Sequence, residues 1–309
     1  MPEITSVAAV VVTYNRKTLL SECIQALLHQ QLPEAVSLDL LVVDNASTDG
    51  TDDMVKPMAR QNDRIHYLPL TKNLGGAGGF HYGMKWAAEQ GYDYIWIMDD
   101  DTIPEEEALA NLLKGAFLAD DFGYVSSTVL WTDGSFCKMN RQHELEPATD
   151  WQKQWKEDAG LIPVDQATFV SLLFPAEVVR QMGLPIKEYF IWGDDKEYTL
   201  RLAAKYPCYR VKDSVVVHKM AQNTGSNITY DEVNRISRYY YAYRNDLATA
   251  KSRGAKDVVI YFAAFVLNMF RVLLHSRDGK KERISIMFKG MRAGLDFHPE
   301  IEFADVEKL

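Results

Sequence analysis

The sequence of 309 residues is poor in cysteine, and the three it has, Cys23, Cys137 and Cys208, lie far apart. Their spacing matches neither a zinc-binding pattern nor a disulfide framework. The opening stretch, MPEITSVAAVVVTYNR, lacks the basic region with which a signal peptide begins, and it runs straight into a strand-like apolar segment. Together these absences predict a protein of the reducing cytosol.

Positive charge is also scarce, with 34 Lys and Arg against 43 Asp and Glu and a formal net charge of −9. This balance argues against a general nucleic-acid binder, so no nucleic acid is expected among the partners. Residues 251–292 are an exception, because they hold ten basic and three acidic side chains, a local balance of +7. The rest of the chain is then −9 − 7 = −16. Such asymmetry predicts a basic surface that faces an anionic partner.

The first 100 residues alternate short apolar runs with helical patterns, and the sequence contains no internal repeat or low-complexity tract. This alternation predicts βαβ units and an α/β fold with a mostly parallel sheet flanked by helices. Strands are expected at residues 7–13, 38–43, 65–68 and 93–98, with helices from the first strand to about residue 31 and at about residues 78–90.

Beyond this region the character of the chain changes twice. Residues 131–165 are irregular and rich in Trp, Asp and Glu, and we expect them to form a loop over a site. After Lys219, helical spacing predicts helices at 232–250, 257–275 and 280–294, the second strongly apolar and the third basic and amphipathic. We therefore expect an α/β domain of residues 1–220 and a small C-terminal helical region of residues 221–309.

Polar side chains follow three of the expected strands at the points where they end. Thr13, Asn15 and Arg16 follow the first strand, Asp44 ends the second, and an Asp triplet at residues 99–101 ends the fourth. In open α/β sheets, ligands bind beyond the carboxyl ends of the strands. The coincidence of the three clusters therefore predicts a ligand site at this edge of the sheet.

The Asp triplet indicates a metal. Carboxylates that close a buried strand are costly unless a cation lies beside them. Mg²⁺ and Mn²⁺ prefer oxygen ligands and typically bridge one or two carboxylates to substrate phosphates. Alternation along an extended chain directs Asp99 and Asp101 to one side and Asp100 to the other, so Asp99 and Asp101 are the predicted ligands. The alternative is a solvated acidic turn that caps a helix beginning at Pro104.

A second acidic pair, Asp194-Asp195, follows Trp192 and Gly193 at the expected start of a helix. Aromatic neighbours would raise the pKa of a carboxyl toward that of a general base, whereas a helix N-terminus would favour the anion. The alternative is that Asp194 caps this helix, with Glu197 completing a capping box.

Two further features concern the same site. His218, at the end of the strand-like run DSVVVHK, is a candidate third metal ligand, and a neutral imidazole suits Mn²⁺ better than Mg²⁺. The glycine cluster at residues 73–79, NLGGAGG, fits neither a dinucleotide-binding nor a P-loop spacing. Its glycines would let the backbone approach a diphosphate or a sugar closely, and the alternative is a flexible turn.

Six motifs occur in an order that resembles the family 2 glycosyltransferases with the GT-A fold, over about residues 5–220. They are VVVTYNR, LLVVDNASTDGT, NLGGAGGF, WIMDDD, WGDDKEYTLRL and VVVHK. Within that family, NLGGAGGF together with the Asp triplet, the Trp-containing Asp pair and a downstream His is most similar to the bacterial galactofuranosyltransferases. Rhamnosyltransferases have a similar layout.

The resemblance implies an inverting sugar transfer onto a hydroxyl of a glycan or lipid-linked glycan in cell-surface polysaccharide synthesis. The implied donor is UDP-galactofuranose, and the alternative donor is dTDP-rhamnose. It implies a Mn²⁺ or Mg²⁺ ion held by Asp99, Asp101 and His218, with Asp195 as catalytic base and Asp194 on the acceptor hydroxyls. The remaining implied contacts are nucleotide-binding (Thr13, Asn15, Arg16, Asp44, Asn73, Asp100) or sugar-binding (Gly76, Trp192).

The sequence departs from that pattern at Gly193, which is inserted where galactofuranosyltransferases often place Trp directly before the acidic pair. The insertion leaves two assignments open, with either Asp195 or Asp194 as the base. The C-terminal part is also much smaller than in the large polymerising members, which favours the addition of one or a few sugar residues.

The apolar segment at residues 258–274 is short for a membrane span and contains Asn268 and Arg271. A peripheral helix backed by basic residues fits an anionic membrane surface, where a lipid-linked acceptor would make docking useful. The alternative is a helix packed on the core or in a homo-oligomer interface.

Two other classes of protein compete with this interpretation. A nucleotidyltransferase also uses strand-end carboxylates and metal, but it usually carries a Gly-rich basic phosphate loop near the N-terminus, where this chain offers only Arg16 and Lys17. A sugar- or lipid-binding scaffold with a degenerate site would not retain the Asp triplet, the Asp pair and His218 together.

Overall fold

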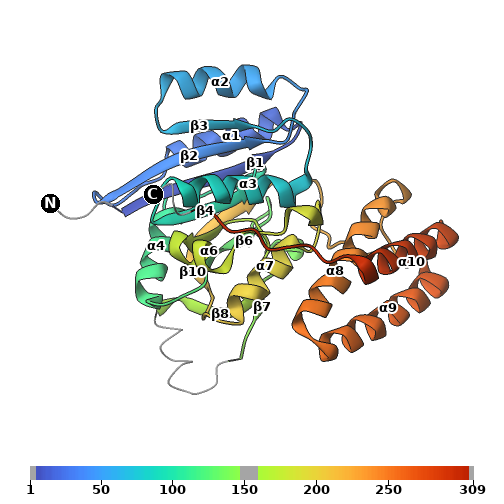
Figure 1. Ribbon diagram of the computed structural model, residues 1–309. Helices are drawn as coiled ribbons and strands as arrows, with labels where there is room; N and C mark the ends of the chain where they lie inside the picture. Colours follow the sequence, from blue (N-terminus) through green and yellow to red (C-terminus); the bar gives the residue numbers. More distant parts are fainter. Residues whose placement is uncertain (1–4, 147–158, 306–309) are drawn as a thin grey trace.

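A mixed sheet forms the centre of the protein, and helices cover both of its faces (Figure 1). The computed structural model describes residues 5–146 and 159–305, and among them a ten-stranded sheet has the order β3-β2-β1-β4-β9-β6-β10-β8-β7, with β5 paired to β10. The strands are β1 (Thr5–Thr13), β2 (Val36–Asp44), β3 (Ile65–Pro69), β4 (Tyr94–Asp99), β5 (Thr102–Pro104), β6 (Val125–Leu130), β7 (His143–Glu144), β8 (Leu161–Gln166), β9 (Leu172–Pro175) and β10 (Tyr209–His218).

The first four strands form the parallel part of the sheet. β1 pairs with β2 and β4, and β2 pairs with β3, all in parallel, as the alternating sequence pattern predicts. The other half is mixed, because β9 is antiparallel to both β4 and β6, while β10 is parallel to β6 and antiparallel to β5 and β8. The predicted α/β class is confirmed, and the antiparallel half is an addition that the pattern of the first 100 residues did not reveal.

The helices are α1 (Lys17–Leu28), α2 (Thr51–Gln61), α3 (Gly75–Glu89), α4 (Ala108–Ala119), α6 (Ala176–Met182), α7 (Asp194–Ala203), α8 (Tyr239–Arg253), α9 (Ala255–His275) and α10 (Lys280–Asp296). Pro104 ends β5, and α4 begins only at Ala108 with Glu107 as its N-cap. The alternative interpretation of the Asp triplet, as a turn that caps a helix beginning at Pro104, is therefore wrong.

The expected loop at residues 131–165 contains short regular elements where the structure describes it. Lys138–Asn140 form a 3-10 turn, and β7 and β8 pair with each other in an antiparallel ladder. Residues 147–158 lie outside the described residues. The 3-10 turn matters for function, because it supplies a side chain to the site described below.

Alternate residues of β1 face two separate hydrophobic cores. Val7, Ala9 and Val11 join the core that includes α1 and α4, whereas the intervening residues of the strand join the core that includes α3. A strand buried on both faces has an uninterrupted apolar sequence, which explains the run VAAVVV. Helix α3 lies very close to this strand, because a Cβ at Gly79 or Gly83 would come within 2.3 Å of a valine side chain of β1. Part of the glycine cluster therefore serves helix–strand packing.

Helices α8, α9 and α10 form a group beside the sheet (Figure 1). Gly290 and Gly294 let α10 pack closely on α8, since a Cβ there would lie 2.5 Å from the carbonyl oxygen of Tyr240 and 2.9 Å from that of Arg244. The three predicted helices at 232–250, 257–275 and 280–294 are present as a 3-10 turn followed by α8, then α9 and α10.

The last described residues return to the sheet and dock beside α3. The backbone N–H of Leu184 donates to the carbonyl oxygen of Glu302 at 2.7 Å. The Glu302 carboxylate accepts hydrogen bonds from Lys187 and Lys85, and these bonds lower its pKa to about 2. The predicted domain boundary near residue 220 stays a prediction. The α/β part and the C-terminal helical part are joined by these contacts as well as by the chain itself.

Candidate active site

The carboxyl ends of three parallel strands meet at one edge of the sheet. Thr13 lies opposite Asp44 in the β1–β2 ladder, and Val12 lies opposite Asp99 in the β1–β4 ladder. On the other side, the pairing of β10 with β5 brings His218 next to the Asp triplet. The predicted polar clusters and His218 are therefore gathered at one place.

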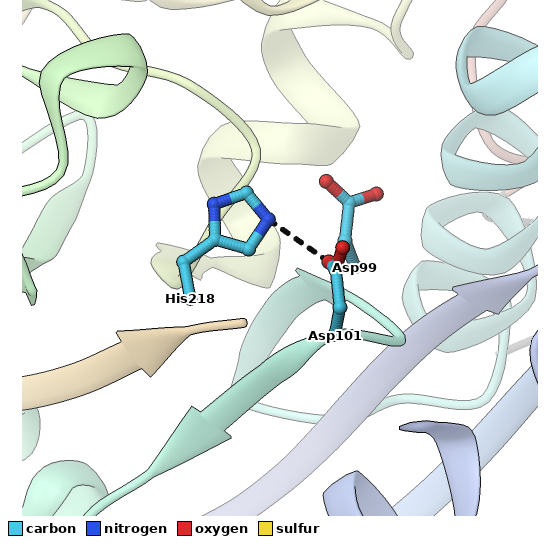
Figure 2. Close-up of side chains that lie close together, drawn as sticks. All are labelled: Asp99, Asp101 and His218. Carbon is cyan, nitrogen blue, oxygen red and sulfur yellow. Dashed lines mark hydrogen bonds and ion pairs between the residues drawn. The ribbon is translucent and has the colours of Figure 1, made fainter. Parts of the chain in front are cut away.

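Asp99, Asp101 and His218 lie close together at this edge (Figure 2). One ligand atom from each residue lies within 4.8 Å of the other two. His218 Nε2 is 2.9 Å from Asp101 Oδ1, and both of these side chains are buried, whereas Asp99 is partly exposed. Two carboxylates and an imidazole in this arrangement form a donor set that suits a divalent transition metal such as Mn²⁺.

The imidazole of His218 is oriented from behind by Asn140 of the 3-10 turn. Asn140 Oδ1 lies 2.8 Å from His218 Nδ1, and its amide donates to Thr168 Oγ1 at 2.8 Å. The thiol of Cys137 also donates to Asn140 Oδ1, at 2.9 Å. Since the amide oxygen can only accept, His218 Nδ1 carries its proton, which leaves Nε2 directed at the carboxylates. The sequence carried no spacing signal for Asn140, because the contact depends on how residues 131–165 fold.

The charges in this cluster perturb one another. Burial raises the pKa of Asp99 to about 7, and the charge of Asp101 adds to the effect. Burial lowers the pKa of His218, but its hydrogen bonds to Asp101 and Cys137 outweigh this and raise the pKa to about 10. Burial likewise raises the pKa of Asp101, yet the bond to His218 and its charge bring that pKa below its ordinary value. A dication would neutralise the charges of the two carboxylates and would bind the lone pair of a neutral His218 Nε2. Asp99, Asp101 and His218 therefore fit a metal ion.

Asp100 and Asp101 lie in a turn after β4, so the strand alternation behind their predicted directions does not extend to them. The Asp100 carboxylate accepts hydrogen bonds from Thr13 Oγ1 at 2.7 Å and from Arg16 Nη1 at 3.2 Å. Arg16 Nη1 also lies 2.5 Å from Asp101 Oδ2, so the guanidinium bridges two members of the triplet. Half of the Arg16 side chain is exposed, which leaves it accessible to an anionic ligand. Burial raises the pKa of Asp100 to about 6, although Arg16 and Thr13 oppose this shift.

Asn15 and Asp44, both expected to bind nucleotide, brace the loops that follow β1 and β2. Asn15 Oδ1 accepts from the backbone N–H of Thr48 at 2.7 Å. Asp44 accepts from the backbone N–H of Ser47 at 2.8 Å and from the Tyr67 hydroxyl at 2.7 Å. These bonds fix the shape of the edge, and the nucleotide contacts of both residues stay a prediction.

The glycine-rich loop is organised by two asparagines. Asn73 Oδ1 accepts from the backbone N–H of Gly75 at 2.8 Å, and Asn45 donates to the Gly75 carbonyl at 3.1 Å while accepting from the N–H of Leu74. Gly76 borders open space, because a Cβ there would meet no atom of the described residues within 4 Å. A sugar or phosphate can therefore approach the backbone at Gly76. Asn45 follows Asp44 in the sequence, and its role in this loop depends on the fold.

The acidic pair begins helix α7. Its N-cap is Gly193 with φ of 89°, and no side-chain cap hydrogen bond forms at this helix start within the described residues. Glu197, the expected partner in a capping box, instead pairs with Arg201 at 2.9 Å. The capping-box alternative is therefore wrong, because Asp194 is not the N-cap and Glu197 has another partner. Asp195 still contacts the helix start, since its Oδ1 accepts from the backbone N–H of Lys196 at 2.7 Å.

Both carboxyls of the pair have raised proton affinity. Burial raises the pKa of Asp195 to about 6. Burial also raises the pKa of Asp194 well above its usual range, and the charges of Asp195 and Asp99 add to that effect. Because the charge of Asp99 acts on Asp194, the pair and the proposed metal ligands belong to one electrostatic unit.

The loop that precedes the pair is held in an unusual backbone conformation. Phe190 and Trp192 have φ of 65° and 64°, a region that side-chain-bearing residues rarely adopt, and Gly193 follows with φ of 89°. On one side of this loop, Gly75 allows a contact that a Cβ would block, since it would lie 1.8 Å from the Phe190 carbonyl oxygen. The glycine-rich loop and the loop before the acidic pair therefore support each other.

Asn245 of α8 holds the same loop from the other side. Its side-chain amide donates toward the carbonyl oxygens of Tyr189 at 3.0 Å, Ile191 at 3.3 Å and Trp192 at 2.7 Å, and the residue is fully buried. A Cβ on Gly193 would lie 3.2 Å from Asn245 Cβ. This close approach accounts for the glycine that is inserted between Trp192 and the acidic pair. Sequence reasoning missed Asn245, because it lies in the C-terminal region about 50 residues after the pair.

Comparison with known proteins assigns the family. The sequence model of Glycosyl transferase family 2 matches residues 8–177, which is more than half of the chain. The chain belongs to glycosyl transferase family 2.

Similar proteins include two enzymes named galactofuranosyltransferase GlfT1. The one from Mycolicibacterium smegmatis is 31% identical over 205 residues, and the one from Mycobacterium tuberculosis is 33% identical over 203 residues. The matched regions cover 63% and 64% of this chain, and 65% and 64% of those relatives, so the chain spans just under two thirds of their length.

Among solved structures, the mannosyltransferase PcManGT from Pyrobaculum calidifontis in complex with GDP-Man and Mn²⁺ aligns with a TM-score of 0.58 at 16% identity, over 96% of this chain and 88% of that one. At this identity the likeness concerns the fold alone. It confirms the predicted GT-A fold, and the family match confirms the glycosyltransferase class of this family 2 protein.

The contact between Asn140 and His218 predicts a measurable effect on metal affinity. We expect Asn140→Leu to weaken Mn²⁺ binding roughly 10- to 100-fold, because the imidazole loses the acceptor that fixes its orientation. Asn140→Asp, which keeps an acceptor oxygen, should restore most of the affinity. Calorimetric titration with Mn²⁺ measures both, with thermal unfolding as a check on folding. Equal affinity in the Leu variant and the wild type would contradict the role of Asn140.

The contact between Asn245 and the loop predicts a selective loss of turnover. We expect Asn245→Leu to lower kcat roughly 10- to 100-fold while the KM for donor changes little, because the loop carries the acidic pair and not the nucleotide contacts. Thr249→Val, which removes a hydrogen bond to the Tyr189 hydroxyl from the same helix, is the matched control and should keep most of kcat. If donor KM rises while kcat stays constant, Asn245 does not position the pair.

Proposed function

We propose that this protein is an inverting, metal-dependent glycosyltransferase that moves galactofuranose from UDP-galactofuranose onto a hydroxyl of a glycan or lipid-linked glycan in cell-surface polysaccharide synthesis. The observation that carries the proposal is the cluster of Asp99, Asp101 and His218 at the carboxyl ends of the strands, whose ligand atoms lie within 4.8 Å of one another. Asp99 and Asp101 with His218 fit a divalent cation, and the charge of Asp99 acts on Asp194. A diphosphate-binding edge beside candidate bases is what sugar transfer requires.

Each side chain then has a distinct role. Asp99, Asp101 and His218 would hold Mn²⁺ or Mg²⁺, which when bound supplies a Lewis acid for the charge that develops on the leaving diphosphate. The nucleotide contacts come from the expected set at the ends of β1, β2 and β4 and from the glycine-rich loop (Thr13, Asn15, Arg16, Asp44, Asn73, Asp100). Gly76 and Trp192 border the sugar and acceptor.

The base is Asp195, with Asp194 binding acceptor hydroxyls. A carboxyl with a pKa of about 6 is ionised near neutral pH and has more proton affinity than an ordinary carboxylate, which suits a general base. Asp195 removes the proton of the acceptor hydroxyl, the oxygen forms a bond to the anomeric carbon, and the bond from that carbon to the diphosphate breaks on the opposite face. The configuration of the anomeric carbon is inverted.

The donor assignment draws on the relatives named galactofuranosyltransferase, and a nucleotide-sugar donor with Mn²⁺ also draws on the mannosyltransferase of like fold. The cellular location is the cytosol, at the inner face of the cell membrane. Cys23, Cys137 and Cys208 are all free and buried, which is consistent with a reducing compartment.

A turnover screen tests the donor and the metal together. We expect release of UDP from UDP-galactofuranose in the presence of acceptor and Mn²⁺, with dTDP-rhamnose, UDP-galactose and UDP-glucose far slower. Chelation with EDTA should abolish turnover, and added Mn²⁺ should restore it. Preference for dTDP-rhamnose would replace the donor assignment, and full activity in EDTA would exclude the metal.

The raised pKa of Asp195 predicts the acidic limb of the pH profile. Because the base must be ionised, kcat/KM should fall about tenfold per pH unit below pH 6 and level off above it. Asp195→Asn should lower kcat by roughly 10²–10⁴. Asp121→Asn, an exposed carboxylate in the loop after α4, is the control and should retain wild-type turnover. The two roles are exchanged if Asp194→Asn abolishes turnover while Asp195→Asn preserves it.

A further inference from the structure

Helix α9 contacts the rest of the protein through one face only. Tyr261, Phe265 and Val272 are buried against α8 and α10. The opposite face is bare and apolar, with large exposed fractions at Val259 (68%), Ile260 (54%), Leu267 (50%), Phe270 (51%) and Leu274 (72%). The helix is long and apolar enough to cross a membrane, yet only 11% of its most apolar 18-residue stretch is buried within the protein.

The bare face is continuous along the helix. Val259, Val266, Phe270 and Leu274 recur at intervals of seven and four residues, so they lie along one side. From Val258 to Phe270 the sequence contains no charged residue. Soluble monomers rarely leave an apolar surface of this extent in contact with water, which indicates that the face is covered when the protein works.

Basic side chains are concentrated in the segment that carries this face. Exposed Lys and Arg lie before and at the start of α9, at its end, and along α10; they are Arg253, Lys256, Arg271, Arg277, Lys280, Lys281, Lys289 and Arg292. Two of the three acidic residues in the same segment already have basic partners, since Asp257 pairs with Arg253 and Asp278 with Arg283. The remainder of the chain has a net charge of −16, whereas this segment carries +7.

This charge pattern distinguishes two ways of covering the face. A two-fold dimer formed through α9 can place the two helices antiparallel or parallel. In the antiparallel case the basic start of one helix lies beside the basic end of the other. In the parallel case each basic residue faces the same residue of the second copy. Both arrangements bring like charges together, which opposes association. An anionic bilayer instead attracts each exposed Lys and Arg while its apolar interior accepts the uncharged face.

We propose that the bare face of α9, together with the basic residues around it, docks the protein on an anionic membrane surface. The helix lies in the plane of the interface and does not span the bilayer, because Tyr261, Phe265 and Val272 remain packed against the protein. Arg271 extends its charged group to the headgroups while its methylene stem covers apolar surface. Docking needs no sugar transfer, so it can be tested separately from the proposed reaction.

Vesicle co-sedimentation of the full chain tests this proposal. We expect binding to vesicles of phosphatidylcholine mixed with phosphatidylglycerol, and binding at least about tenfold weaker to phosphatidylcholine alone or at high salt. The triple variant V266S/F270S/L274S should lose binding to the mixed vesicles at least about tenfold. The control F117S/L118S alters two exposed apolar residues of α4 and should bind as the wild type does.

Two measurements separate the outcomes. Sedimentation velocity without vesicles should give the same monomeric species for the wild type and the triple variant. Absent vesicle binding, or a wild-type dimer that the triple variant dissociates, would overturn the proposal, and the dimer would assign the face to a second copy of the chain. With a water-soluble acceptor the triple variant should turn over normally, so failure of docking is distinguished from failure of the proposed transfer.

Discussion

The close placement of acidic side chains at the end of β4 is the constraint on which the rest of the site depends. Asp99 and Asp101 repel each other in a region that excludes much of the surrounding water, which is why the pKa of Asp99 is raised. The fold compensates with the imidazole of His218 and the guanidinium of Arg16, both within hydrogen-bond distance of Asp101. A bound dication would supply more charge than either, so the repulsion favours metal binding over an empty site.

Segments far away in the sequence hold the residues of this site in place. Asn140 orients His218 from the 3-10 turn, and Asn245 holds the strained loop before the acidic pair from the C-terminal helices. Positive φ angles at Phe190 and Trp192 persist because hydrogen bonds on one side and the glycine-rich loop on the other maintain them. The C-terminal region therefore helps to shape the candidate active site.

This architecture would connect the proposed docking surface to the proposed chemistry. Helix α8 provides Asn245 to the site, and α9 and α10, which carry the bare face and the basic residues, pack on α8. The return of the last described residues to α3, through Glu302, further joins this helical group to the sheet. An acceptor attached to a lipid would thus be presented beside the helix that positions the acidic pair.

The sequence by itself determined the parallel strands, the clusters at their ends and the apolar character of α9, because these depend on local periodicity and on a general rule about strand ends. It also indicated Asp99, Asp101 and His218, since few residue types can serve a metal at such positions. The antiparallel half of the sheet, Asn140 and Asn245 were decided only by the tertiary structure. Their contacts join segments far apart in the chain, and an asparagine in a turn or a helix has no periodic pattern that reveals its partner. The rejection of a capping box at Asp194 also required the fold, because Gly193 takes the N-cap position and Arg201 pairs with Glu197.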